Sequence, residues 1–209
     1  MVESSGTFEA LEVELTALAE MHIAAFDSYV EVINDPVKGH FARYTTEQGN
    51  KLTVAKYRAA GLTLDKIRDH YKNIVENAPK LNKTYLLTKI DQVGTYSIWH
   101  NLAKVPFPLT NRSTVSCEYI KETDGTFVFM VSSKGCEPFI QKHAKIIGKN
   151  VIGRGILVYE KYTPYEGGYD ITTISCVDPA GSIPGFLKDF VAKKHAEAPL
   201  TLYNLMMFG

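Results

Sequence analysis

The sequence predicts a single α+β domain dominated by antiparallel β-sheet. Its 209 residues are enough for one globular domain with a sizeable core. Short runs rich in β-branched and aromatic residues recur along most of the chain between turn-forming residues, and these runs indicate strands. Three longer segments have apolar residues at helical spacing. Because no linker or repeat divides this order, we interpret residues 1–209 as one domain.

The first helix is expected from Phe8 onward, because leucines from Leu11 to Leu18 recur at helical spacing with acidic residues between them. Three strands follow at SYVEVIN, HFARYTT and KLTVAKYRA, and the turns DPVKG and EQGN connect them. A second helix is expected over LTLDKIRDHYKNIVENAP. Thr63 is its predicted N-cap, and Pro79 is expected beyond its end.

Six further strands are predicted before the last helix. They are TYLLTKI, TYSIWHNLAK, STVSCEYIK, TFVFMVSS, IGRGILVYEKY and YDITTISCV, with hairpin turns at TDG and YEGG. The last helix is amphipathic, and its apolar face carries Ile183, Phe186, Leu187, Phe190 and Val191. We expect Ser182 to cap this helix, Pro184 to lie in its first turn, and Pro199 to kink or interrupt it.

Charge and cysteine content limit the class of protein. The 23 Lys and Arg residues balance 23 Asp and Glu residues, so no net field favours nucleic acid as a partner. Three widely spaced cysteines favour reduced thiols in the cytoplasm over a disulfide framework or a zinc site. The N-terminus lacks the pattern of a secretory signal. We therefore expect a cytoplasmic protein that does not bind nucleic acid.

Two stretches, VPFPLTNR and VDPAGSIPGFL, resemble motifs of the START family, the lipid-transfer domains related to steroidogenic acute regulatory protein. In that family a strand leads into a Pro-Phe-Pro loop, and an Asp-Pro-x-Gly-x-Ile-Pro turn opens the last helix. Element order and length also agree along nearly the whole chain. The resemblance implies a helix-grip (START/Bet v 1-like) fold, in which a curved antiparallel sheet wraps a long C-terminal helix and encloses a hydrophobic tunnel.

The resemblance further implies a monomeric, non-enzymatic carrier of one lipid that touches membranes transiently and uses no cofactor. The last helix and a neighbouring loop are expected to move as a lid. The lipid class stays open, because Asn101 and Thr114 replace the aromatic residues of the phosphatidylcholine-binding branch. Trp99 and Glu118 likewise replace the facing acid and base of the sterol-binding branch. Ser113 also stands where the family usually has an aspartate.

Candidate ligand-binding residues follow from the strand containing residues 112–120. Its alternating residues form two faces, and hydrophobicity alone would bury the face with Val115, Cys117 and Tyr119. The family comparison points the other face inward, and we follow it. The predicted ligand-binding set is Trp99, Asn101, Arg112, Thr114, Ser116, Glu118, Phe127, Phe129, Phe186, Leu187 and Phe190. An exposed acid at Glu118, and plain packing by the aromatic residues, are the alternative interpretations.

Two other functional classes stay open. A helix-grip enzyme of cyclase or hydrolase type would use Glu118 or a histidine as acid or base. A ligand-sensing module would instead change its affinity for a partner when it binds lipid. The six histidines show no metal-binding spacing, and no serine or cysteine lies in a nucleophile-elbow motif. Lys193, Lys194 and His195 are interpreted as a solvated helix face.

Overall fold

The computed structural model describes residues 5–105, 108–181 and 183–209, with the side chains of residues 5, 186 and 187 excepted. The helices are α1 (Ser5–Ala24), the 3-10 helix η1 (Phe26–Ser28), α2 (Leu64–Lys72), α3 (Ile74–Leu81), α4 (Glu137–Lys142), α5 (Ala144–Ile147) and α6 (Gly185–Phe208). The strands are β1 (Val30–Asp35), β2 (His40–Glu47), β3 (Asn50–Ala60), β4 (Tyr85–Val93), β5 (Tyr96–Ala103), β6 (Arg112–Thr123), β7 (Thr126–Ser132), β8 (Val151–Ile152), β9 (Arg154–Tyr165) and β10 (Gly168–Asp178).

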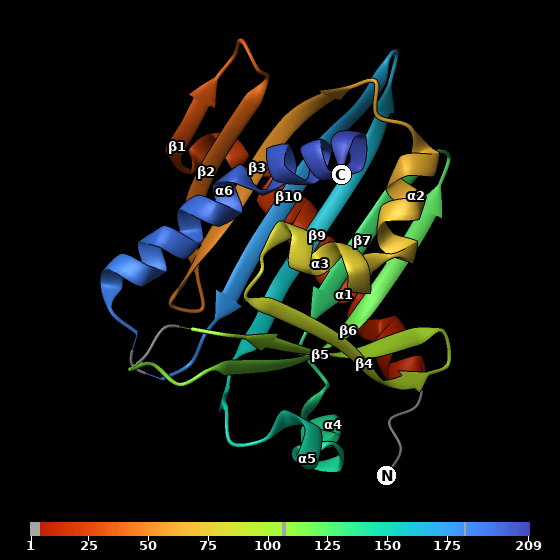
Figure 1. Ribbon diagram of the computed structural model, residues 1–209. Coiled ribbons are helices and arrows are strands. Elements are labelled where there is room, and N and C mark those ends of the chain that lie inside the picture. The colour runs from red at the N-terminus through yellow and green to blue at the C-terminus, as the bar shows by residue number, and fades with distance from the viewer. Residues whose placement is uncertain (1–4, 106–107, 182) are drawn as a thin grey trace.

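The strands form one ten-stranded sheet in the order β1-β2-β3-β10-β9-β7-β6-β5-β4, with β8 paired to β6. All neighbours are antiparallel except β8 and β6. The sheet is curved, with α6, α2 and α3 on one face and α1 on the other (Figure 1). We call the face toward α6 the inner face and the face toward α1 the outer face. The predicted fold class, an antiparallel sheet around a long C-terminal helix, is confirmed.

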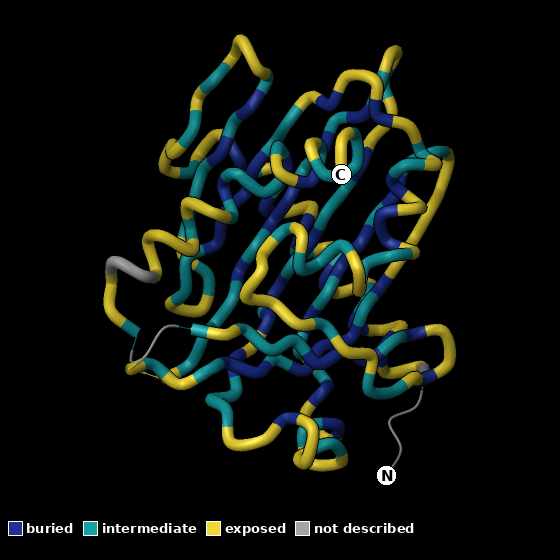
Figure 2. Tube along the Cα trace, viewed as in Figure 1, coloured by how far each residue is buried: buried dark blue, intermediate teal, exposed yellow. Residues whose placement is uncertain are grey.

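The outer face carries the larger apolar cluster. Phe8 and Leu15 of α1 pack there with Val115, Cys117 and Tyr119 of β6. Because side chains alternate along a strand, the intervening residues of β6 lie on the inner face. Hydrophobicity therefore identified the side of β6 that packs against α1. Figure 2 shows that burial is concentrated in these central strands, whereas the N-terminal part of α6 is largely exposed.

Close packing holds α6 against the inner face. Ala196 packs on Ala42 of β2 and Ala55 of β3, and these small side chains allow the helix axis to approach the strands. His40 Nε2 donates a hydrogen bond to the Ala196 carbonyl oxygen at 2.8 Å. This bond lies beside Pro199, whose missing N–H weakens the helical ladder. The helix changes direction along its length, as the predicted kink requires, but it is not interrupted (Figure 1).

The start of α6 differs from the prediction. The helix begins at Gly185, and Pro184 occupies the N-cap position with extended backbone rather than the first turn. The predicted cap, Ser182, lies outside the described residues. The turn that precedes the helix is held by Asp178, whose Oδ1 accepts a hydrogen bond from the Ala180 backbone N–H at 2.9 Å.

The second predicted helix is two helices, α2 and α3, separated at Asn73. Thr63 caps α2 as predicted, because its Oγ1 accepts a hydrogen bond from the Lys66 backbone N–H. The side-chain amide of Asn73 donates to the Asp69 carbonyl oxygen, and this local bond competes with helix continuation. The chain then resumes a helix at once, so Pro79 lies inside α3 and not beyond its end.

Four elements had no counterpart in the sequence prediction: the 3-10 helix η1, the strand β8, and the helices α4 and α5. The run IGRGILVYEKY forms two strands, β8 and β9, instead of one. At Gly153, between them, an added Cβ would lie 3.0 Å from the Asp178 carbonyl oxygen. The helices α4 and α5 follow β7 in a segment to which the sequence assigned no element. The three cysteines are buried, and no disulfide joins them in the described ranges. None of the helices in the described ranges is long and apolar enough to cross a membrane.

Candidate functional site

The predicted polar residues of β5 and β6 gather on the inner face as cross-strand pairs. Trp99 lies opposite Ser116, and Asn101 lies opposite Thr114. Glu118 continues the same face of β6 one step beyond Ser116. Directly opposed residues of antiparallel strands have Cβ atoms about 5 Å apart. The register therefore brings five of the predicted side chains into one contiguous strip.

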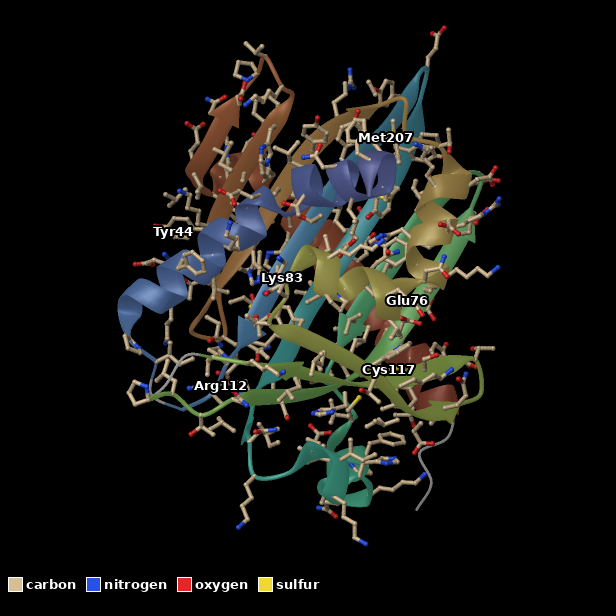
Figure 3. All side chains as sticks on the ribbon, viewed as in Figure 1. Tyr44, Glu76, Lys83, Arg112, Cys117 and Met207 are labelled. Carbon is tan, nitrogen blue, oxygen red and sulfur yellow. The ribbon has the colours of Figure 1, made fainter. Side chains whose placement is uncertain are left out.

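Several buried polar atoms of this strip and of Arg112, which adjoins it on β6, have no hydrogen-bond partner among the described residues. They are Trp99 Nε1, Ser116 Oγ and Arg112 Nε. Arg112 is 8% exposed, and its Nη1 donates to the Thr110 carbonyl oxygen. Figure 3 shows Arg112 at the start of β6, with Cys117 farther along the same strand. An unmade buried hydrogen bond costs about 1–3 kcal/mol, so these atoms favour a polar ligand group or a water molecule.

Glu118 has an environment unlike that of an exposed strand acid. Its side chain is partly accessible, yet burial raises the pKa of its carboxyl group above the usual value. The indole N–H of Trp99 and the charge of Lys89 oppose that rise only in part. The indole N–H faces the carboxyl group outside regular hydrogen-bond geometry. The inner face thus holds an acidic group with unused hydrogen-bonding capacity.

Phe127 and Phe129 lie in an aromatic cluster of the inner face under α2. Their rings stack on Tyr71 of α2 at centroid distances of 5.0 and 4.5 Å. Both phenylalanines are almost fully buried, at 4% and 6% exposure. This arrangement fits the packing interpretation of these two residues.

The predicted residues of α6 are not gathered with the strip in the described part of the chain. Phe190 is 57% exposed, and the Lys194 ammonium lies 5.9 Å from its ring centroid. The side chains of Phe186 and Leu187 lie outside the described residues. A ligand-binding role for these three positions stays a prediction.

His195 was assigned to a solvated helix face, and that assignment is wrong. Lys193 and Lys194 are exposed, but burial lowers the pKa of His195 to about 4. The imidazole nevertheless keeps some accessible surface and makes no hydrogen bond to any described residue. A neutral imidazole offers one donor and one acceptor nitrogen. The Lys-Lys-His sequence gave no signal of this, because the environment of His195 depends on how α6 packs.

Tyr85 of β4 combines the same two properties as His195. It is 39% exposed by surface area, yet burial raises the pKa of its hydroxyl group. Its neighbour across the sheet is Ala103, which in turn lies opposite Arg112, so Tyr85 belongs to the inner face. No hydrogen bond joins the Tyr85 hydroxyl to any described residue. The sequence gave no reason to distinguish this tyrosine from the others.

The partly buried carboxyl group of Glu160 and two tyrosines complete the inner face. Glu160 of β9 accepts hydrogen bonds through Oε2 from the hydroxyls of Tyr71 and Tyr162, the latter at 3.1 Å. The two hydroxyl oxygens lie 2.7 Å apart. Burial raises the pKa of Glu160 above its usual value, and the tyrosine bonds oppose that rise only in part. Sequence reasoning missed this cluster, because α2 supplies one of its members.

A separate pocket of about 560 Å3 lies where the end of α6 meets α2 and α3. Glu76 of α3 and the nearby end of α6, marked by Met207, can be followed in Figure 3. The lining residues are mostly polar: Asp65, Lys66, Asp69, His70, Asn73, Glu76, Asn77, Lys80, Leu205, Met206 and Gly209. Both signs of charge occur there, so the pocket has no strong preference for an ion of one charge.

The described residues contain one pair with the spacing of a catalytic base and nucleophile, and no cluster suited to a metal ion. No group of His, Cys, Asp and Glu side chains there is arranged to hold a metal ion. His100 Nε2 lies 2.9 Å from Ser113 Oγ, as a base lies beside a serine nucleophile. However, Ser113 is fully buried, and its hydroxyl also bonds to Asn150 and to the Ile147 carbonyl oxygen. This pair fastens the loop after α5 to the outer side of the sheet.

Comparison with known proteins supports the fold. No family model and no curated protein sequence matches the chain. Human StAR-related lipid transfer protein 5 superposes with a TM-score of 0.71 at 14% identity, over 95% of this chain and 97% of that one. For human STARD10 the TM-score is 0.69 at 14% identity, over 99% and 81% of the two chains.

A bacterial structure agrees with the two human ones. The STAR-related lipid transfer protein from Xanthomonas axonopodis, solved as a fragment, has a TM-score of 0.63 at 14% identity, over 85% of this chain and 98% of that one. The protein therefore has the helix-grip fold of START domains, as the two sequence motifs predicted. At this level of identity the likeness shows the fold alone.

Proposed function

We propose that this protein is a single lipid-binding domain that holds one lipid between the inner face and α6 and exchanges it with membranes. The observation that carries the proposal is the polar strip of the inner face, in which Trp99 Nε1 and Ser116 Oγ are buried without a hydrogen-bond partner among the described residues. The environments of His195 and Tyr85 agree with it. Both side chains keep accessible surface, and both have pKa values shifted by loss of hydration. A group facing bulk water would not be desolvated. The two properties are compatible if the accessible surface faces an enclosed space.

The inner face supplies both kinds of contact that a lipid needs. Val131 and Val158 lie opposite each other on β7 and β9 and are partly accessible. They continue the row of Glu118, so an apolar stretch adjoins the polar strip. Pockets for apolar ligands typically combine such walls with a few placed polar groups. Trp99 Nε1 and Ser116 Oγ can donate hydrogen bonds to the polar end of the ligand.

The fold supports the same function. The structural relatives named above include proteins called lipid transfer proteins. Burial of the ligand contributes about 25 cal/mol per Å2 of apolar area, which must offset removal from an equally apolar bilayer. Exchange therefore requires close fit and reversible binding. We further propose a cytoplasmic monomer that makes transient peripheral contact with membranes and binds no nucleic acid or cofactor.

Native mass spectrometry of the purified protein, followed by extraction of bound lipid and a liposome transfer assay, tests the proposal. We expect one lipid per chain and transfer between vesicles of mixed composition. A His195→Leu, Tyr85→Phe double variant lacks two polar groups that have no partner in the interior. We expect it to bind a different range of lipids from the wild type. A Lys193→Gln variant, which changes an exposed neighbour on α6, serves as the matched control.

Absence of both bound lipid and transfer would contradict the proposal. Recovery of the lipid in chemically altered form, with loss of that alteration in Glu118→Gln, would instead establish the enzymatic alternative. Comparison of partner affinity with and without lipid separates a carrier from a ligand sensor.

A further inference from the structure

The cluster of Tyr71, Glu160 and Tyr162 contains hydrogen-bonding capacity that the protein does not use. Both tyrosine hydroxyls reach the same carboxyl oxygen of Glu160, Oε2. The other oxygen, Oε1, makes no hydrogen bond to any described residue. Tyr71 and Tyr162 are almost fully buried, whereas Glu160 keeps partly accessible surface. The two tyrosines therefore fix the carboxyl group and leave one oxygen free.

The position of Glu160 directs this free oxygen toward the proposed ligand space. Its neighbours across the sheet are Phe129 of β7 and Thr173 of β10. The preceding residue, Tyr159, belongs to the outer cluster, so Glu160 faces inward. Glu160 lies two residues beyond Val158, which shares its row with Glu118. From sheet dimensions the two carboxyl groups are about 12 Å apart, at opposite ends of a short apolar stretch.

The charge around Glu160 limits what can bind there. No Lys or Arg among the described residues pairs with it, and no cation opposes the effect of burial on its pKa. A ligand carboxylate or phosphate at this point would meet an acid with no neutralising base. A hydroxyl or amine hydrogen would instead complete the hydrogen bonding of the carboxyl group, and hydrogen bonds to charged groups are the stronger ones.

We propose that Glu160 Oε1, held by Tyr71 and Tyr162, accepts a hydrogen bond from the bound lipid. The ligand is accordingly a lipid whose polar group carries a hydroxyl or amine hydrogen, and not a free fatty acid or a lipid with its phosphate at this point. This inference rests on the proposed function. It adds a second polar contact, remote from the strip on β5 and β6, that selects the chemical class of the ligand.

Paired probes test the inference. A long-chain primary alcohol, its methyl ether, and the corresponding amine and fatty acid are presented in phosphatidylcholine vesicles, and their affinities are measured by displacement of a bound fluorescent lipid. We expect the wild-type protein to bind the alcohol about tenfold or more tightly than the ether, because the ether lacks one hydrogen bond to a carboxylate. The fatty acid should bind more weakly than the alcohol and the amine.

The variant Glu160→Gln separates recognition from structure. Its amide oxygen can accept both tyrosine hydroxyls, which turns the NH2 group toward the ligand. That group donates equally well to a hydroxyl or an ether oxygen, so the ratio of the two affinities should fall to about one. Glu20→Gln is the matched control, because Glu20 accepts the Tyr159 hydroxyl at 3.1 Å from the outer side of the sheet. In Glu20→Gln the ratio of the affinities for the alcohol and the ether should equal that of the wild type.

The possible outcomes discriminate between the two proposals. Binding of lipid with equal affinity for alcohol and ether in the wild type would overturn this inference and leave the proposed function intact. A lowered melting temperature in Glu160→Gln with an unchanged affinity ratio would assign the cluster a purely structural role and would also overturn it. Failure of the wild type to bind any probe or cellular lipid would refute the proposed function, and this inference with it.

Discussion

The low pKa of His195 predicts a specific pH dependence of stability. Burial lowers this pKa from 6.5 to about 4, so the folded protein favours the neutral imidazole. Above pH 6.5 the imidazole is neutral in both the folded and the unfolded protein, so His195 has no effect on stability. As the pH falls from 6.5 toward 4, only the unfolded state gains the proton, and the fold is increasingly destabilised. Since one pKa unit corresponds to 1.36 kcal/mol, the full effect is about 3 kcal/mol, of which about 2 kcal/mol is reached at pH 5. His195→Gln should remove this loss.

Urea unfolding of wild type and variant at pH 7.5 and pH 5 measures the effect. We expect the wild type to lose about 2 kcal/mol more than His195→Gln between these pH values. Titration of the imidazole by NMR gives the pKa directly. Lys193→Gln should follow the wild type, because this exposed residue does not share the buried environment. A His195 titration midpoint near 6.5, with equal pH dependence in both proteins, would place the ring in bulk water and contradict an enclosed interior beside α6.

Three further predictions concern the two faces of the sheet. Ala196→Leu should overpack the contact with Ala42 and Ala55, lowering the free energy of unfolding by about 1–3 kcal/mol; an unchanged value in urea titration would contradict the close approach of α6. Phe8→Ala removes a fully buried ring from the outer cluster and should cost about 3–5 kcal/mol without altering lipid selectivity, which binding assays at low temperature can check. Trp99→Phe deletes an unpaired buried donor, so the lipid-free protein should keep its stability while affinity for polar lipids falls; a large loss of stability would show that the indole N–H is already satisfied.

The strand architecture was predictable because its signals are local. Alternating apolar residues identified the long strands, and Asp124 and Gly125 both adopt positive φ in the hairpin turn expected at TDG. The division between β8 and β9 was not predictable. Gly153, which lies between the two strands, closely approaches the carbonyl oxygen of Asp178, and this tertiary contact leaves no mark on the local sequence. At the break between α2 and α3, the side-chain amide of Asn73 donates to both the backbone carbonyl and the side-chain carboxyl group of Asp69.

The candidate site was predictable only in part. The register of β5 and β6 places Trp99 against Ser116, and the sequence had already assigned both to one side of their strands. Glu160 looks like an ordinary acid on a half-exposed strand until α2 places Tyr71 over it. His195 looks like part of a basic surface until α6 packs through the adjacent Ala196. In both cases tertiary contacts determine the environment of the residue, and neither contact leaves a mark on the local sequence.

The unequal character of the two faces is compatible with the proposed ligand binding in a stable fold. On the outer face, α1 covers an apolar cluster that includes Phe8, Cys117 and Tyr159. That cluster supplies packed area independent of the ligand, and burial of apolar area is the main source of stability. The inner face and the α6 helix that covers it are therefore free to retain unpaired polar groups, such as those of Ser116 and His195. Each unpaired group lowers the stability of the ligand-free protein. A ligand that forms the missing hydrogen bonds regains this free energy and is therefore bound in preference to one that cannot form them.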